Sequence, residues 1–384
     1  MTNRERALAV LNYKPYYRLP IVHFGFWPET LVKWADEGHI TEEQARNWCD
    51  GTPIDKQIGD LLGFDFGWYN CFTHNSDLSP TFEPKVLKIH PDGSREVLSS
   101  IGVIELAKDN TVSIPAEIDH LLKDRASWEK HYLSKLQFST ERITGAFVNT
   151  GSEFLPFQKG GLDFLLREDR ENVVGLHCGS LFGRIRNWLG VEGISYLYMD
   201  DESLFDEIIR VNADLCFECV KTVLKSGAKF DFAHFWEDIC FKNGPLVIPS
   251  VFDAKVGPHY KRITDLVRSY GIQIVSLDCD GLIDSLIGTW FRNGVNTMFP
   301  IEVGTWNAEI RPWRDKYGTE LRGVGGMNKT VFAYDMAAID AEIERLRPLV
   351  ELGGYIPCPD HRIAPDAKWD NVRYYCDKMR MIFH

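Results

Sequence analysis

Ionisable side chains recur directly after short β-rich runs of this sequence. The residues in these places are His23, His177, His234, Asp278, Asp280, Glu302, Lys329 and His361. Carboxylates and imidazoles are the groups that proteins use for general acid–base chemistry and for binding divalent metals. One polar strand end means little, but a ring of them at one edge of a parallel sheet predicts a polar ligand-binding site, because buried carboxylates need partners.

A metal ion is the first partner that this pattern suggests. Asp278 and Asp280 share parity at one strand end, Glu302 ends the following strand, and His361 follows the last strand. Carboxylates crowded together without a cation are destabilised, so a metal or a basic side chain such as Lys329 or Arg362 is required. The predicted metal ligands are Asp278, Asp280, Glu302 and His361. Zinc is the first choice, and a metal-free polar site is the alternative.

The remaining candidates are assigned to catalysis and to substrate binding. The predicted catalytic residues are Glu237, Asp280 and His361. The predicted substrate-binding residues are His23, Phe26, Trp27, His177, His234, Trp236 and Lys329, whose aromatic members would wall the site. Structural explanations stay open for several: Asp278 or Asp280 could cap the next helix, Glu237 could pair at the surface, and His361 could be a loop histidine.

Alternating strands and helices must position these residues. β-rich runs occur at 19–24, 173–177, 229–234, 271–277, 294–300, 321–326 and 354–358, and helical patterns at 201–224, 336–352 and 369–381. This alternation is typical of parallel β-α-β units. We predict an α/β fold, a (β/α)₈ TIM barrel forming one domain over 1–384, with an open doubly wound sheet as the alternative. Residues 1–150 form an N-terminal elaboration that includes the first strand and hairpins near 70–120, and 151–384 hold the regular units.

Composition limits the class of protein. The 384 residues carry a formal charge of −12 and are 44% hydrophobic. The acidic balance argues against nucleic-acid binding, and no apolar run is long enough to predict a membrane span. The N-terminus does not resemble a secretory signal. Nine cysteines in a chain of this length do not suggest a disulfide framework, so we expect a cytoplasmic protein.

Several stretches together resemble the uroporphyrinogen decarboxylase superfamily. They cover about 170–384, with a weaker match over 1–40, and include His234-Phe235-Trp236-Glu237-Asp238, Asn243-Gly244-Pro245, Asp280-Gly281 and His361-Arg362-Ile363-Ala364-Pro365. The resemblance implies a (β/α)₈ barrel with a cleft at the carboxyl ends of the strands. It also implies one of two activities, because the superfamily holds porphyrinogen decarboxylases and cobalamin-dependent methyltransferases.

The resemblance favours the methyltransferase branch. The decarboxylases have arginines after the first strand, where this chain has His23-Phe24-Gly25-Phe26-Trp27. The methyltransferases bind zinc through a His-x-Cys and a tail cysteine, where this chain has Asp278-Cys279-Asp280 and His361, a departure that argues against a thiolate site.

The resemblance thus implies transfer of a methyl group between a small molecule and a corrinoid held by a partner protein. Demethylation of a methoxylated aromatic is one form of this reaction. A decarboxylase or lyase of a small carboxylic acid, and a catalytically silent binding barrel, are the alternatives. Homo-oligomerisation stays open.

Overall fold

A seven-stranded parallel sheet forms the centre of the protein, whose computed structural model describes residues 1–108 and 115–384. The strands run in the order β17-β16-β15-β14-β11-β10-β3, and neighbours pair in parallel. They are β3 (Cys71–Phe72), β10 (Gly175–His177), β11 (Phe232–Trp236), β14 (Val275–Asp278), β15 (Thr297–Phe299), β16 (Arg322–Met327) and β17 (Tyr355–Pro359). Every residue of β14 to β17 is buried, as expected of parallel strands covered on both faces. The predicted parallel α/β architecture is confirmed.

The two ends of this sheet come close together. β1 (Val22–His23) and β2 (Phe66–Gly67) form a separate parallel pair. β1 lies against β17, and Phe26 bridges in parallel to Ile363 beyond it. β2 is separated from β3 by only three residues. The strands thus wrap round as a barrel requires, although the described residues form no continuous closed ladder.

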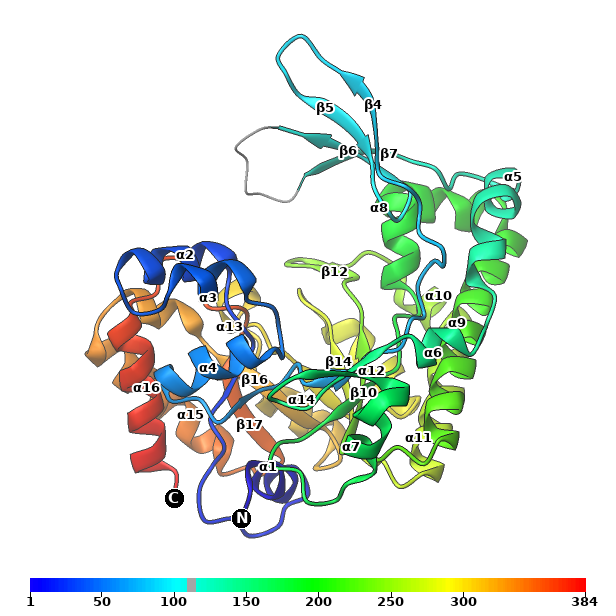
Figure 1. The fold of residues 1–384 in the computed structure, drawn as a ribbon. Helices are drawn as coiled ribbons and strands as arrows, with labels where there is room; N and C mark the ends of the chain where they lie inside the picture. Colours follow the sequence, from blue (N-terminus) through cyan, green and yellow to red (C-terminus); the bar gives the residue numbers. More distant parts are fainter. Residues whose placement is uncertain (109–114) are drawn as a thin grey trace.

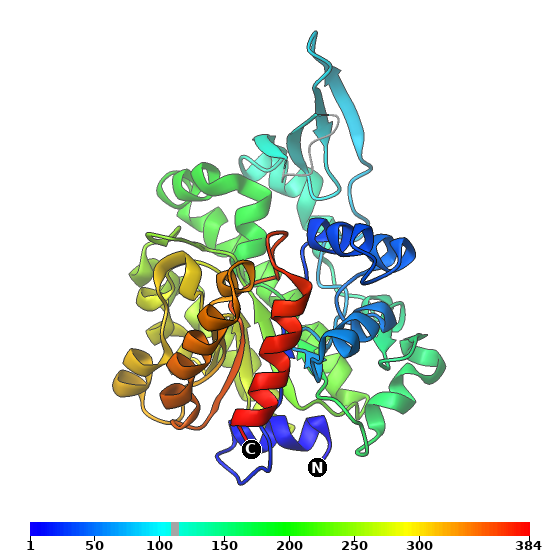
Figure 2. The same cartoon turned by 90° about the vertical axis from the view of Figure 1, so that its left-hand side faces the viewer.

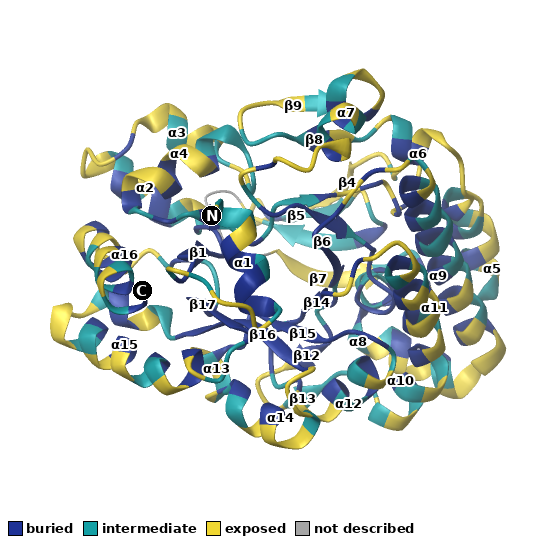
Figure 3. Ribbon diagram, turned by 90° about the horizontal axis from the view of Figure 1, so that it is seen from below, coloured by how far each residue is buried: buried dark blue, intermediate teal, exposed yellow. Residues whose placement is uncertain are grey.

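Helices surround the strands, and all of them except the short helix Val303–Trp306 bury residues against the core (Figure 3). They are α8 (Gly183–Asp200), α9 (Glu202–Lys225), α10 (Pro249–Lys255), α11 (Gly257–Ser269), α12 (Asp284–Arg292), α13 (Val303–Trp306), α14 (Ile310–Tyr317), η4 (Lys329–Ala333), α15 (Met336–Val350) and α16 (Trp369–Ile382). Aspartates cap the two longest of the helices that have a side-chain cap: the Asp201 carboxylate accepts from the Leu204 N–H at the start of α9, and Asp335 accepts from the Ala338 N–H at the start of α15. α16, red in Figure 2, runs along the outside of the molecule.

The N-terminal elaboration covers one side of the strands and carries a projecting sheet. Its helices are α1 (Asn3–Leu11), α2 (Pro28–Asp36), α3 (Glu42–Asn47) and α4 (Pro53–Leu62). The projecting four-stranded antiparallel sheet, called the arm below, consists of β4 (Lys85–Ile89), β5 (Arg95–Leu98), β6 (Val103–Ala107) and β7 (Ala116–His120). The arm stands away from the rest of the molecule (Figure 1). It corresponds to the hairpins predicted near 70–120.

Short elements complete the chain. They are α5 (Arg125–Ser127), η1 (Trp128–Tyr132), η2 (Leu133–Leu136), α6 (Glu141–Thr144), β8 (Phe147–Asn149), β9 (Phe154–Pro156), η3 (Phe157–Gly161), α7 (Leu162–Leu166), β12 (Cys240–Phe241) and β13 (Gly244–Pro245). None of the helices in the described ranges combines the length and the apolarity needed to cross a bilayer.

One glycine of α8 allows the arm to pack closely against that helix. Gly190 interrupts α8 with φ +70° and ψ 167°, a left-handed φ that other residues rarely adopt. A Cβ atom at this position would lie 2.5 Å from the Nε2 of His120, the last residue of β7. Gly190 therefore permits both the break in α8 and the close approach of the arm.

Candidate functional site

The carboxyl ends of β14, β15 and β17 bring the four predicted metal ligands into one region. Asp278 ends β14, Asp280 follows it, Glu302 follows β15 and His361 follows β17. Asp280 Oδ2 lies 3.2 Å from His361 Nε2, and Glu302 Oε2 accepts a 2.5 Å hydrogen bond from Gly281 N–H. Gly281 makes this turn possible, because its φ is +84° and a Cβ atom would lie 2.5 Å from the Cys240 carbonyl oxygen.

These carboxylates are crowded. The pKa of Asp278 is raised well above its usual range, first by burial and then by the charge of Asp280, although Tyr69 Oη donates a hydrogen bond to it. The pKa of Glu302 is also raised, first by burial and then by Asp280, against the hydrogen bond from Gly281 and the nearby His361. The site therefore holds more negative charge than its own surroundings stabilise.

As placed, the four side chains do not fit a metal ion. Glu302 Oε1 accepts from Thr305 Oγ1 at 3.0 Å while its Oε2 accepts from Gly281, and Asp278 is engaged by Tyr69. Within residues 1–108 and 115–384, no group of three or more His, Cys, Asp or Glu side chains is arranged to hold a metal. The predicted zinc therefore has no support from the donor arrangement. Asp280 Oδ1 is buried without a hydrogen-bond partner, so it is free to receive a donor from a ligand.

Aromatic rings surround the His361 imidazole. Trp27 stacks on it with ring centroids 5.5 Å apart and planes inclined by 19°, and Phe24 meets it edge-on at 5.3 Å. Phe24 also stacks on Tyr69 at 5.4 Å and packs against Phe299 at 4.5 Å. Of the predicted aromatic residues, Trp27 lies against His361, the ion-pair partner of Asp280, and Phe24 and Tyr69 adjoin it.

A cationic side chain that follows His361 in the chain is also held by aromatic rings and a carboxylate. The Arg362 guanidinium lies 5.9 Å from the Phe24 ring centroid and 5.4 Å from that of Trp48. It donates two hydrogen bonds to the Asp50 carboxylate, one of them 3.1 Å long. Because bidentate arginine–carboxylate pairs are geometrically specific, this pair joins the 48–52 turn to the loop after β17.

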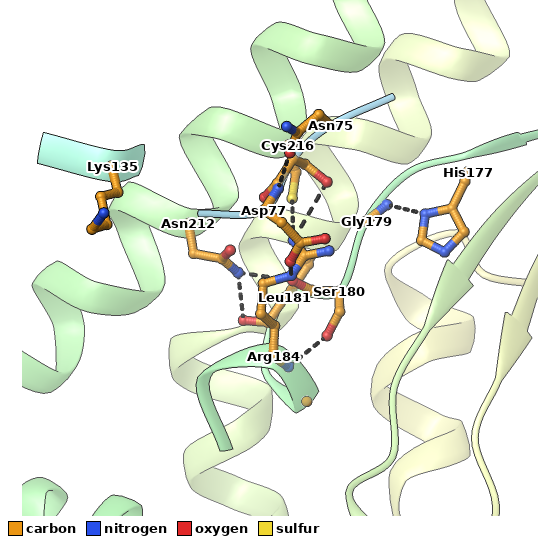
Figure 4. A network of polar contacts seen from close by, with 12 residues as sticks. Asn75, Asp77, Lys135, His177, Gly179, Ser180, Leu181, Arg184, Asn212 and Cys216 are labelled. Atoms are coloured by element: carbon orange, nitrogen blue, oxygen red, sulfur yellow. Dashed lines mark hydrogen bonds and ion pairs between the residues drawn. The ribbon is translucent and has the colours of Figure 1, made fainter. Parts of the chain in front are cut away.

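His177 ends β10, whereas His234 lies in the middle of β11 and does not follow the strand as predicted. They are register partners with ring centroids 5.9 Å apart. Burial lowers the pKa of His177 to about 4 and that of His234 well below its usual range, so both rings are neutral near pH 7. His177 Nδ1 accepts from Gly179 N–H at 3.0 Å (Figure 4). His234 is 0% exposed with both ring nitrogens unpaired, so it is not open to a substrate in this structure.

Glu237 occupies a different environment from the other predicted catalytic residues. It is 1% exposed and accepts hydrogen bonds from Leu181 N–H at 2.6 Å, Gly183 N–H at 2.5 Å and Tyr260 Oη at 2.5 Å, and also from Ser180 Oγ and Phe182 N–H. Burial raises its pKa, and these donors oppose that effect. The contacts hold the start of α8 against the end of β11, a positioning role. The predicted catalytic role has no support from this geometry.

The loop that Glu237 holds is also tied to α9. Asn212 of α9 donates a 2.8 Å hydrogen bond to the Ser180 carbonyl oxygen (Figure 4). Arg184 donates to the Ser76 carbonyl oxygen at 2.8 Å and forms an ion pair with Asp77. These contacts set the position of the segment that follows His177.

The other predicted substrate-binding residues divide into two groups. His23 and Phe26 are buried, packed together at 5.2 Å, and His23 lines a small hollow against α4 that does not include Asp280. Their predicted roles have no support from this placement. Trp236 is half-buried and is the register partner of Asp278, and Lys329 Nζ lies 4.0 Å from Asp360 Oδ1 after β16. These two stay near the strand ends.

Two residues of this region were not predicted from the sequence. Tyr69 reaches Asp278 from the turn between β2 and β3, and Asp50 reaches Arg362 from the turn before α4. The one available signal was the polar and aromatic run Trp68-Tyr69-Asn70. The flanking strands have two residues each, too few for a periodicity to be read.

Comparisons with known proteins identify a solved structure whose fold is similar to that of this chain. No protein-family model matches the chain, and no curated protein matches its sequence. A solved structure of a methyltransferase from Methanosarcina mazei is similar, with a TM-score of 0.60 and 12% identity over 99% of this chain and 98% of that chain. A Listeria monocytogenes protein provisionally described as a vitamin-B12-independent methionine synthase matches with a TM-score of 0.42 and 14% identity over 96% and 98%, too low to carry an argument. This chain therefore shares the fold of the Methanosarcina protein along nearly its whole length.

Proposed function

We propose that this chain is an enzyme that moves a methyl group between a small molecule and a corrinoid carried by a partner protein. The observation that best supports this proposal is the Asp280–His361 pair at the carboxyl ends of the parallel strands. Glu302 and the Trp27 ring lie beside the pair. Enzymes built on parallel barrels keep their active sites at this end. The fold shared with a protein named as a methyltransferase supports the choice of reaction.

The chain's own residues would bind and orient the small molecule. The rings of Trp27 and Phe24 offer apolar faces against which a methyl-bearing group can pack, and Asp280 and His361 offer hydrogen-bonding groups to its polar end. A reduced corrinoid supplies the nucleophile that accepts a methyl group, and the partner protein would bring it to this face. Neither Glu237 nor His234 contacts the substrate in this scheme.

A spectroscopic assay tests this proposal. The purified chain is mixed with free cobalamin in the Co(I) state and with a panel of methoxyarenes and methylated amines, before and after treatment with a chelator and with zinc added back. We expect enzyme-dependent loss of the Co(I) absorbance with at least one compound. Release of carbon dioxide from a carboxylic acid panel, without methyl transfer, would establish a decarboxylase instead, and inactivity in both assays would favour a binding protein.

A matched pair of variants ties any activity to the site. Asp280→Asn removes the carboxylate that pairs with His361, and we expect a loss of at least about a hundredfold in kcat/KM. Asp366→Asn changes an exposed aspartate on the same loop as His361 and is expected to leave kcat/KM unchanged. Equal activity of the two variants would contradict the placement of the site.

A further inference from the structure

Some of the carboxylates at the strand ends have no cationic partner in the described part of the chain, and this indicates the charge of the substrate. Asp50 is paired with Arg362, and Asp360 lies near Lys329. The remaining carboxylates, Asp278, Asp280 and Glu302, form within the described residues a single ion pair, from Asp280 to His361. Burial and the charge of Asp280 raise the pKa values of Asp278 and Glu302, and a bound cation would favour the ionised forms of these carboxylates.

The aromatic rings beside these carboxylates show what the region accommodates. Two of the chain's own nitrogen groups are held between aromatic rings and a carboxylate. The Arg362 guanidinium contacts Phe24, Trp48 and Asp50, and the His361 imidazole stacks on Trp27, meets Phe24 edge-on and pairs with Asp280. Ring faces carry negative potential and attract cations, above all alkylated ammonium groups that water solvates weakly. At Asp278 the neighbouring group is the Tyr69 hydroxyl, which donates a hydrogen bond, and among the described residues no cationic side chain forms an ion pair with this carboxylate.

We propose that this site binds a methylated ammonium cation and that its N-methyl group is the one transferred. The ligand would lie beside the Trp27 ring and the Asp280 Oδ1 atom that has no hydrogen-bond partner, with Asp280 and Glu302 supplying the opposite charge. The inference rests on the proposed function for the fate of the methyl group. The binding of the cation rests on the carboxylates and the rings alone.

The chemistry of such a donor suits this site. In transfer from a quaternary ammonium, the carbon–nitrogen bond breaks with its electron pair on nitrogen, and a neutral tertiary amine leaves. The reduced corrinoid acceptor supplies the electron pair of the new bond to carbon, so no proton is consumed. A methoxyarene would instead need a proton or a Lewis acid at its leaving oxygen.

Binding of a cation and its neutral isostere tests the inference without any turnover. Choline and 3,3-dimethylbutan-1-ol have the same shape, but only choline is charged. We expect choline to bind at least about tenfold more tightly in titration calorimetry. Asp280→Asn and Glu302→Gln should each remove most of this preference, and Asp366→Asn should retain it. Equal affinity for the two compounds, or binding of neither at millimolar concentration, overturns the inference.

The two proposals fail in different ways. Choline preference without methyl transfer from any methylated ammonium would leave the cation site standing and overturn the methyltransferase function. Methyl transfer from methoxyarenes by a protein that shows no choline preference would support the methyltransferase function and overturn the cation site. Because the isostere comparison uses the unmodified chain, it holds even if a variant folds poorly.

Discussion

Asp280 and Glu237 follow neighbouring strands, yet their carboxylates have opposite environments. The Asp280 side chain is 36% exposed and keeps a buried oxygen without a partner, whereas Glu237 is 1% exposed and accepts from main-chain and hydroxyl donors. A carboxylate surrounded by fixed donors is stabilised in place, and one with a free oxygen is available to a ligand. This contrast supports the proposed role of Asp280 in the site and the positioning role of Glu237.

Replacing Glu237 tests this distinction. Glu237→Gln puts an NH₂ group where an acceptor stood, leaving buried donors such as Leu181 N–H or Gly183 N–H without a partner. We expect the free energy of unfolding to fall by about 2–3 kcal/mol in urea titrations. Glu192→Gln, on the exposed side of α8, is the control and should change it by less than about 0.5 kcal/mol. Indistinguishable stabilities would show that Glu237 does not hold α8.

At the scale of elements, the arm and the central strands differ sharply in packing. All five residues of β4 are exposed and its described ladder partner is β5, whereas β16 is buried between β15 and β17. Local opening costs little where few apolar contacts break. The arm should therefore open independently of the core.

Hydrogen exchange checks this difference. In the isolated chain, backbone amides of β4 should exchange at least about a hundredfold faster than those of β16, as measured by mass spectrometry of peptic fragments. The β16 peptides act as the internal reference. Comparable protection of the two strands would mean that the arm is covered in solution, for example by a second copy of the chain.

At the scale of the whole molecule, buried ionisable groups make stability depend on pH. Burial lowers the pKa of His74 to about 3 and that of His177 to about 4, and lowers that of His234 well below its usual value. The unfolded chain therefore binds more protons than the folded chain between about pH 4 and 6.5, and stability falls as the pH falls through this window. Asp278 and Glu302, with raised pKa values, act in the opposite direction and cost stability as the pH rises above their usual range.

Urea unfolding at pH 7 and pH 5 measures the histidine contribution. For each histidine that stays buried and neutral, the free energy of unfolding should be lower by about 2 kcal/mol at pH 5 than at pH 7, because the side chain becomes protonated in the unfolded chain. His234→Phe removes that group and should reduce the loss by about this amount. A variant whose pH dependence equals that of the unmodified chain would contradict the assignment of His234 as a buried neutral ring.

The amino-acid sequence by itself determined where the main parallel strands and most long helices lie. The runs near 275, 298, 324 and 356 became β14 to β17, and the polar residues after three of them, Asp278, Glu302 and His361, meet at one edge. Such runs are readable because burial on both faces demands continuous apolar residues, and parallel strands end on the same side. Zinc, the single-domain division and a cytoplasmic location stay predictions.

The tertiary structure alone decided which polar residues share a site. Tyr69 and Asp50 joined it, while His23 and Glu237 turned to other partners. The side-chain direction after a strand end depends on the dihedral angles of the next turn, as at Gly281. Arg362 and Asp50 meet across 312 positions of the chain. Local patterns of residue type hold no information about contacts of that range, so only the packing of the elements could bring these side chains together.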